Sequence, residues 1–287
     1  MFERILFPID FSEVSVDALE NCIPQFEAKE VIIIHVVEYV EDIGVLEKIQ
    51  MKAKGEVDRL VEKLKNKGVN AKGYVSIGSI ASTISTEARC PSIEILDRAY
   101  CEMVDLIVIP SKGKHIRRRM QIGSTARNLI RKSSIPVLVL KYDWNEKKNE
   151  LECRCDCEKL FTKPLIALDL SRCSEYTGVV VRKFEENVKE ARIIHIIDYG
   201  DIDEIEENIN KAKQALKVFA DKFKFESEII VDSGIASKEI IVKAIEFGAS
   251  VIVLGKTGRG FLKEILLGST ADEVIKEGSI PTLIVPC

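Results

Sequence analysis

GSTARNLIRKSSIPVLVL at 123–140 and GSTADEVIKEGSIPTLIV at 268–285 are two versions of one segment in a chain of 287 residues. They align without a gap and are identical at half of their positions. Each opens with Gly-Ser-Thr, continues with apolar residues at helical spacing and ends in an apolar run, which predicts a helix followed by a strand. A repeat of this length indicates an internal duplication.

Two earlier segments repeat in the same order. RILFPIDFSEVS at 4–15 matches KPLIALDLSRCS at 163–174, and VIIIHVVEY at 31–39 matches ARIIHIIDY at 191–199. Because the order of start, second strand and end is kept, the chain is predicted to contain one domain twice in tandem.

A length of 287 residues suits two domains of ordinary size. We predict a first domain (unit one) at 1–140, a linker at 141–162 and a second domain (unit two) at 163–287. Unit one is the longer, because IASTISTEARCP is inserted near 80–91. The linker is charged, shows little apolar periodicity and contains the only tryptophan.

The composition excludes several classes of protein. A hydrophobic share of 46% is that of a globular chain, and a net charge of −4 argues against a chain-wide surface for nucleic acid or anionic membrane. No apolar run approaches the ~18 residues of a membrane helix, and MFERILFPID at 1–10 carries charges within its apolar stretch, unlike a signal peptide. We therefore expect a soluble, cytoplasmic protein with no nucleic-acid or membrane partner.

Within each unit, short apolar strands alternate with helical stretches. In unit one the helix over 45–67 is expected to end at Gly68, and strands are expected at 31–37, 71–77, 104–109 and 135–140. In unit two strands are expected near 164–169, 191–197, 226–231, 250–254 and 280–285, and helices near 174–188, 203–223, 237–247 and 269–277. This alternation predicts an α/β fold with a parallel sheet covered on both faces. Pro8, inside the first strand, conflicts with a central strand position.

The chemistry is expected where the fourth strand of unit two ends. Gly255 and Gly258 would permit close backbone approach and positive φ, and Gly268-Ser269 opens a helix whose free N–H groups favour an anion. Nearby positive charge would come from Lys256, Arg259 and Lys263, and Asp169 would accept a hydrogen bond from a base or sugar. The same residues also have a purely structural interpretation, in which they form a simple turn, a helix cap and solvated surface charges. A P-loop is excluded, because its required glycine would fall on Ser250.

The whole pattern resembles the ATP-binding branch of the universal stress protein family, which shows G-x2-G-x9-G-(S/T). The segments ILFPIDFS, LIALDLS, IIHVVE and IIHIID resemble its first two strands. The resemblance implies two Rossmann-like (adenine nucleotide alpha hydrolase-like) domains, each with a five-stranded parallel sheet of order 3-2-1-4-5. It also implies ATP or AMP as ligand, with Mg²⁺ accompanying ATP. The nucleotide-binding residues that it implies in unit two are Asp169, Ile196, Leu254, Gly255, Gly258, Arg259, Gly268, Ser269 and Thr270.

A second, weaker site is implied in unit one. Its residues are Asp10, Val36, Ile109, Gly113, Gly123, Ser124 and Thr125. Pro110 stands where the first glycine of the motif belongs, and proline removes an N–H and fixes φ. Five basic residues in the loop 111–122 would still favour an anionic ligand at this site.

Assembly and activity follow from the same resemblance. In the family the last strand pairs with its counterpart across a two-fold axis, so we expect the two units to form a pseudo-dimer within the chain, open to further homodimer formation. His35 and His195 repeat but have no acid at a fixed offset, and a role in the fold explains them. We expect no catalytic residues, at most slow ATP hydrolysis, and a regulatory or signalling role in the stress response.

The cysteines open an alternative function. Eight cysteines without an export signal do not indicate a secreted disulfide framework, and most are expected to be small buried side chains. Cys153, Cys155 and Cys157 alternate, so an extended chain would present all three thiols on one side, and Cys173 is the candidate fourth ligand for a soft metal. Incidental thiols on an exposed linker without metal are the expected state. The alternative function is a nucleotide-independent interaction scaffold whose linker cysteines sense metal or redox state.

Overall fold

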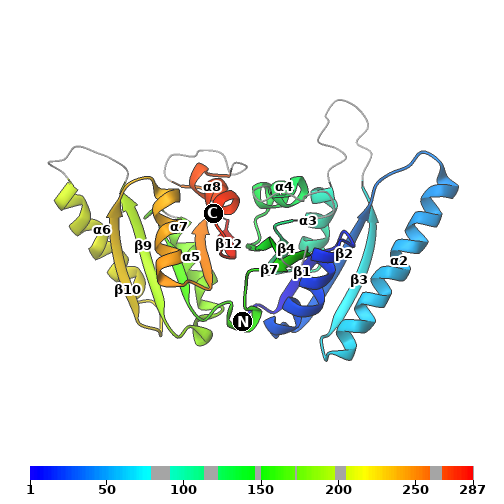
Figure 1. Ribbon diagram of the computed structural model, residues 1–287, viewed down its shortest axis with the longest axis horizontal. Helices are drawn as coiled ribbons and strands as arrows, with labels where there is room; N and C mark the ends of the chain where they lie inside the picture. The colour runs from blue at the N-terminus through cyan, green and yellow to red at the C-terminus, as the bar shows by residue number, and fades with distance from the viewer. Residues whose placement is uncertain are drawn as a thin grey trace.

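A computed structural model describes residues 1–78, 91–112, 122–145, 150–171, 173–197, 205–258 and 267–286. The insertion near 80–91, apart from Pro91, and the loop positions Gly113, Arg259 and Lys263 lie outside these residues. The described chain forms one ten-stranded sheet that runs through both units, with helices on either side (Figure 1). This architecture confirms the predicted α/β class with two homologous units.

Unit one supplies half of this sheet, in the order β3-β2-β1-β4-β5. All neighbours within this half are parallel. The strands are β1 (Arg4–Pro8), β2 (Glu30–Val37), β3 (Ala71–Ile77), β4 (Leu106–Pro110) and β5 (Val137–Leu140). The helices are α1 (Glu13–Asp17), η1 (Ala18–Cys22), η2 (Ile23–Phe26), α2 (Ile43–Asn66), α3 (Pro91–Cys101) and α4 (Ser124–Lys132).

Unit two repeats this arrangement in the order β10-β9-β8-β11-β12, again with parallel neighbours. Its strands are β8 (Pro164–Ala167), β9 (Ala191–Ile197), β10 (Ser227–Ser233), β11 (Val251–Gly255) and β12 (Thr282–Val285). Its helices are α5 (Cys173–Arg182), η5 (Glu185–Asn187), α6 (Ile205–Ala220), α7 (Ala236–Phe247) and α8 (Ser269–Glu277). Within the described parts of the chain, no helix is long and apolar enough to cross a membrane.

The two halves meet at their last strands. β5 and β12 pair antiparallel, with Thr282 opposite Val139 and Ile284 opposite Val137. Pairing buries two strands that would otherwise be exposed apolar edges. This contact confirms the pseudo-dimer predicted within the chain, and α4 and α8 lie beside each other above it (Figure 1).

Two continuous cores cover the faces of the sheet. Alternate residues of each strand point to opposite faces, so Leu138 belongs to one core and Val139 to the other. Both cores draw residues from both units. A third, small cluster of Val37, Leu46 and Ala53 lies within unit one, so the two cores shared by both units hold most but not all of the buried apolar surface.

Pro8 is tolerated because it is the last residue of β1. The backbone N–H of Ile9 donates to Ile34 of β2, so the nitrogen of Pro8 faces the opposite side, toward β4. Pairing between β1 and β4 ends at Leu6, whereas the matching pairing of β8 with β11 continues to Ala167, the counterpart of Pro8. The proline therefore shortens this ladder only at its end.

Among the described helices, α2, α7 and α8 end at a glycine, as predicted for Gly68. Gly68 follows α2 with φ of 81°, and Gly248 follows α7 with φ of 65°, a left-handed conformation that glycine adopts without a side-chain clash. Gly278 ends α8 in an extended conformation.

The segment 141–162 is more ordered than the expected linker. It forms a hairpin, β6 (Tyr142–Asn145) and β7 (Glu150–Cys153), followed by η4 (Cys157–Lys159). Tyr142, Leu160 and Phe161 are buried in the first core. The prediction of an exposed linker was wrong, because these few apolar side chains suffice to dock it on unit one and unit two.

Candidate functional site

Unit two has a cavity of about 810 Å³ at the carboxyl ends of its strands. Its size lies within the ~300–1,000 Å³ of small-molecule sites. The chain brings together here eight of the residues implied by the family motif: Asp169, Ile196, Leu254, Gly255, Gly258, Gly268, Ser269 and Thr270. Asn208 and Lys211 of α6 also line it, and the sequence alone carried no signal for them.

Asp169 lines this cavity, and one of its two carboxylate oxygens has no partner among the described residues. Its Oδ1 accepts hydrogen bonds from the backbone N–H and hydroxyl of Ser171, at 3.0 and 2.8 Å, and from the hydroxyl of Ser174 at 3.2 Å. Its Oδ2 is buried and accepts no hydrogen bond from the described residues. A buried acceptor left unpaired costs about 1–3 kcal/mol, so this oxygen is suited to a ligand that donates an N–H or O–H group.

His195 fixes the backbone that carries Asp169. Its Nδ1 donates to the carbonyl of Leu168 at 2.7 Å, and His35 does the same to Ile9, the residue before Asp10, at 2.7 Å. Both histidines therefore serve the fold next to the cavity, as their repetition suggested.

The motif glycines allow close packing of backbone rather than left-handed turns. A Cβ on Gly268 would lie 3.3 Å from the carbonyl oxygen of Lys256, and one on Gly255 would lie 3.3 Å from the carbonyl oxygen of Thr257, both closer than an ordinary contact. Gly255 and Gly258 do not adopt the positive φ that a glycine permits. Small size is what this turn requires.

The first turn of α8 faces the cavity. Gly268 is its N-cap and supplies no side-chain acceptor, so the N–H groups at its start remain available to an anion. Lys256 does not supply the expected charge there: its ammonium donates to the carbonyl of Ser133 at 3.0 Å, at the end of α4 across the pseudo-dimer contact. The side chain satisfies a helix C-terminus of the other unit.

Unit one has a larger cavity, of about 1220 Å³, at the corresponding place. The implied residues that line it are Asp10, Val36, Ile109, Gly123, Ser124 and Thr125. Oδ1 of Asp10 accepts from the Ser12 backbone at 2.9 Å and from the hydroxyls of Ser12 and Ser15, at 2.6 Å each, which repeats the pattern at Asp169.

Pro110 distinguishes the two cavities. In unit two the N–H of Lys256 donates to Val285 of β12, so the N–H of Gly255 faces β8, where the ladder pairs Leu254 with Ala167. Pro110 occupies this place in unit one and lines the cavity without an N–H. Pairing between β1 and β4 reaches only Leu6 and Ile107, so the strand ends beside the two cavities differ.

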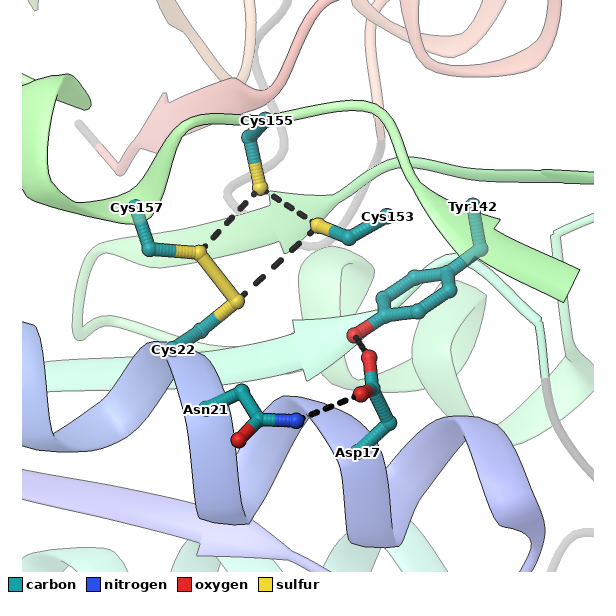
Figure 2. The surroundings of a disulfide bond; sticks show 7 residues. All are labelled: Asp17, Asn21, Cys22, Tyr142, Cys153, Cys155 and Cys157. Atoms are coloured by element: carbon teal, nitrogen blue, oxygen red, sulfur yellow. Dashed lines mark hydrogen bonds between the residues drawn. A yellow bond between two sulfur atoms is a disulfide. The ribbon is translucent and has the colours of Figure 1, made fainter.

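Four cysteines form a second polar cluster, away from both cavities. Cys22, Cys153, Cys155 and Cys157 place their sulfur atoms within 4.8 Å of one another (Figure 2). Cys173, the candidate fourth ligand, begins α5 and is not in this group. That prediction was wrong because Cys22, 131 residues before Cys153, has no sequence signal linking it to the trio.

The state of these thiols also differs from expectation. Cys22 and Cys157 are joined by a disulfide, whereas Cys153 and Cys155 are free. The contact with the Cys155 thiol lowers the pKa of Cys153 to about 7, and the same contact together with burial raises the pKa of Cys155. Of the trio none is fully exposed, and Cys101 on α3 is exposed rather than buried.

A model of the universal stress protein family matches residues 1–141 and 165–286. The chain belongs to the universal stress protein family. A universal stress protein of Methanocaldococcus jannaschii is 30% identical over 166 residues, covering 49% of this chain and 96% of that protein. A second one from the same organism is 32% identical over 148 residues, covering 49% of this chain and 83% of that protein. Each such relative corresponds to about one unit of this tandem universal stress protein.

The whole tandem also has a structural counterpart. The crystal structure of a universal stress protein from Archaeoglobus fulgidus superposes with a TM-score of 0.73 at 22% identity, covering 99% of this chain and 98% of that one. The two universal stress proteins share the fold over their full length.

Proposed function

We propose that this tandem universal stress protein binds an adenine nucleotide, ATP or AMP, in the cavity of unit two and acts as a regulatory module of the stress response. The observation that carries this proposal is Asp169, which lines a cavity of nucleotide size and whose buried Oδ2 accepts no hydrogen bond from the described residues. An exocyclic amino group of adenine, or a ribose hydroxyl, is the kind of donor that it lacks.

The opposite side of the cavity suits the phosphates. The start of α8 offers backbone N–H groups, the hydroxyls of Ser269 and Thr270 add donors, and the tight turn at Gly258 and Gly268 leaves room for a ligand to approach the backbone. With ATP, Mg²⁺ would be bound through phosphate oxygens and water, as this ion prefers.

Binding is favoured over catalysis. Among the described residues that line the cavity, Asp169 is the one carboxylate, and its Oδ1 is already held by two serines. The ring of His195 is held by the Leu168 carbonyl. No described group is arranged to activate a water molecule, so we expect hydrolysis of ATP to be slow.

Native mass spectrometry of the freshly purified full chain tests this function. We expect a mass increment of AMP, ADP or ATP, lost in Asp169→Ala and retained in the matched variant Asp10→Ala. Protein without any nucleotide increment, both as purified and after incubation with millimolar ATP or AMP, would refute the proposal and favour a nucleotide-independent scaffold.

A further inference from the structure

Four sulfur atoms from two distant parts of the chain converge on one point. Cys22 comes from the end of η1 in unit one, whereas Cys153, Cys155 and Cys157 come from the connecting segment (Figure 2). We propose that the chain in its reduced state binds one thiophilic divalent cation, with Zn²⁺ as the reference ion, through these four cysteines. This inference is independent of the proposed nucleotide site.

The spacing of the sulfur atoms fits a single tetrahedral ion. Zinc–sulfur bonds of about 2.3 Å place the four sulfurs of a tetrahedral site about 3.8 Å apart. The Sγ atoms of Cys22 and Cys153 are 3.9 Å apart, and those of Cys155 and Cys157 are 3.5 Å apart. Cys153 and Cys155, at 2.6 Å, must separate by about 1 Å to fit that spacing. A cluster of several metal ions with bridging sulfides needs cysteine sulfur atoms that lie farther apart than these, so a single ion fits best.

The surroundings hold these side chains in place. Cys22 is 2% exposed, and the other three are partly buried against the first core. Beside them, the buried hydroxyl of Tyr142 donates to Asp17 at 2.8 Å, and Asn21 donates to the same carboxylate at 2.7 Å. These bonds join the connecting segment, through Tyr142, to the helical stretch that ends at Cys22.

The arrangement points to a structural role. Four cysteine ligands leave no open position for a substrate, which is the pattern of structural rather than catalytic zinc. The ion would tie η1 of unit one to the segment that leads into unit two, across a sequence separation of 135 residues between Cys22 and Cys157.

Reduction must precede binding, because Cys22 and Cys157 are joined in this structure. A phosphine reductant supplies two electrons to the sulfur–sulfur bond. Two protons from water complete the two thiols, and the oxygen of that water leaves as phosphine oxide. Zn²⁺ then replaces the protons of the thiols, which are released to solvent.

The test is a titration of the full chain, stripped of metal and reduced with a phosphine under argon, with Zn²⁺ in competition with a chromophoric chelator. We expect one Zn²⁺ per chain. Replacing a ligand costs more than the ~10–100-fold typical of an outer contact, so Cys22→Ser and Cys155→Ser should each weaken binding at least about a hundredfold. Cys101→Ser, which changes an exposed free thiol on α3, is the matched control and should bind as the parent does.

Two results would overturn the proposal: a reduced parent chain that binds no Zn²⁺, or a Cys155→Ser chain that binds it as tightly as the parent. Cys22 is buried and its replacement can disturb folding, so circular dichroism accompanies each titration. Cys155 is partly exposed, and its variant decides the matter should Cys22→Ser fail to fold.

Discussion

Asp10 and Asp169 show how closely the two units repeat each other in single side chains. In each, Oδ1 is held by two serines, and a histidine of the next strand holds the carbonyl just before the aspartate. The units differ at the end of the fourth strand, where Pro110 replaces Gly255. We infer that Pro110, which lacks an N–H and fixes φ beside the cavity, makes unit one the weaker site.

Restoring the donor should strengthen that site. Pro110→Gly returns an N–H that faces β1 and removes the fixed φ of proline from the backbone that lines the cavity. We expect this freer backbone to approach a phosphate, and one hydrogen bond to a charged phosphate is worth about 1.5–3 kcal/mol, so nucleotide affinity in unit one should rise by up to about one to two decades. The measurement is equilibrium binding in an Asp169→Ala background, where unit two is disabled. Unchanged affinity would show that the proline is not what limits unit one.

Lys141 is a buried charge at the contact between the units. Its ammonium donates to the carbonyl of Ile275 near the end of α8, as Lys256 does to the end of α4. Burial lowers the pKa of Lys141 from 10.5 to about 8, partly offset by Asp143 and Glu277. The lysine thus satisfies a helix end but carries a desolvation cost.

Lys141 should make stability depend on pH. Between about pH 8 and 10.5 its side chain binds a proton in the unfolded chain but not in the folded one, so stability increases as pH rises through this window, by about 3 kcal/mol in full. The difference in free energy of unfolding between the parent and Lys141→Met should shift in favour of the parent by that amount, as measured by urea denaturation. Lys52→Met, at an exposed position, should show no such shift. A parallel pH profile for parent and Lys141→Met would contradict this account.

Among the elements, the connecting hairpin β6–β7 was the least predictable. Its strands, YDWN and ELEC, are four residues each, so the alternation of apolar and polar residues in them is too short to predict a hairpin. The hairpin is held in place by contacts with residues more than a hundred positions away. By contrast, most strands, helices and cavity residues could be predicted from the repeated segments, because the residues of each motif are close together in the sequence. Cys22 and the inward turn of Lys256 escaped prediction for the same reason as the hairpin: their partners are distant in sequence.

Tyr142 anchors this hairpin to unit one. Its hydroxyl donates to the carboxylate of Asp17, and its ring is 2% exposed. Tyr142→Phe keeps the ring but leaves the carboxylate one donor short, which should lower the free energy of unfolding by about 1.5–3 kcal/mol. Chemical denaturation checks this, with Tyr176→Phe on the exposed side of α5 as the control expected to change little. Equal stability of Tyr142→Phe and the parent would mean that the hydroxyl contributes nothing to docking the hairpin.

The whole molecule is a single folding unit in this description, because both cores and the sheet pass from one half to the other. We expect one cooperative transition on unfolding. Fluorescence of Trp144 reports on the hairpin, and far-ultraviolet circular dichroism reports on all helices and strands. The two curves should coincide in urea, and two separated transitions would show that the halves are stable independently.

The central claim is that unit two holds the tighter adenine-nucleotide site of this tandem universal stress protein. Calorimetric titration of nucleotide-free protein with ATP, and separately with AMP, tests it most directly. We predict a tight phase that Asp169→Ala removes and Asp10→Ala leaves intact, followed by a weaker phase, because Pro110 stiffens the backbone that lines the cavity of unit one. Two equal sites, or a tight phase lost in Asp10→Ala and kept in Asp169→Ala, would contradict the assignment.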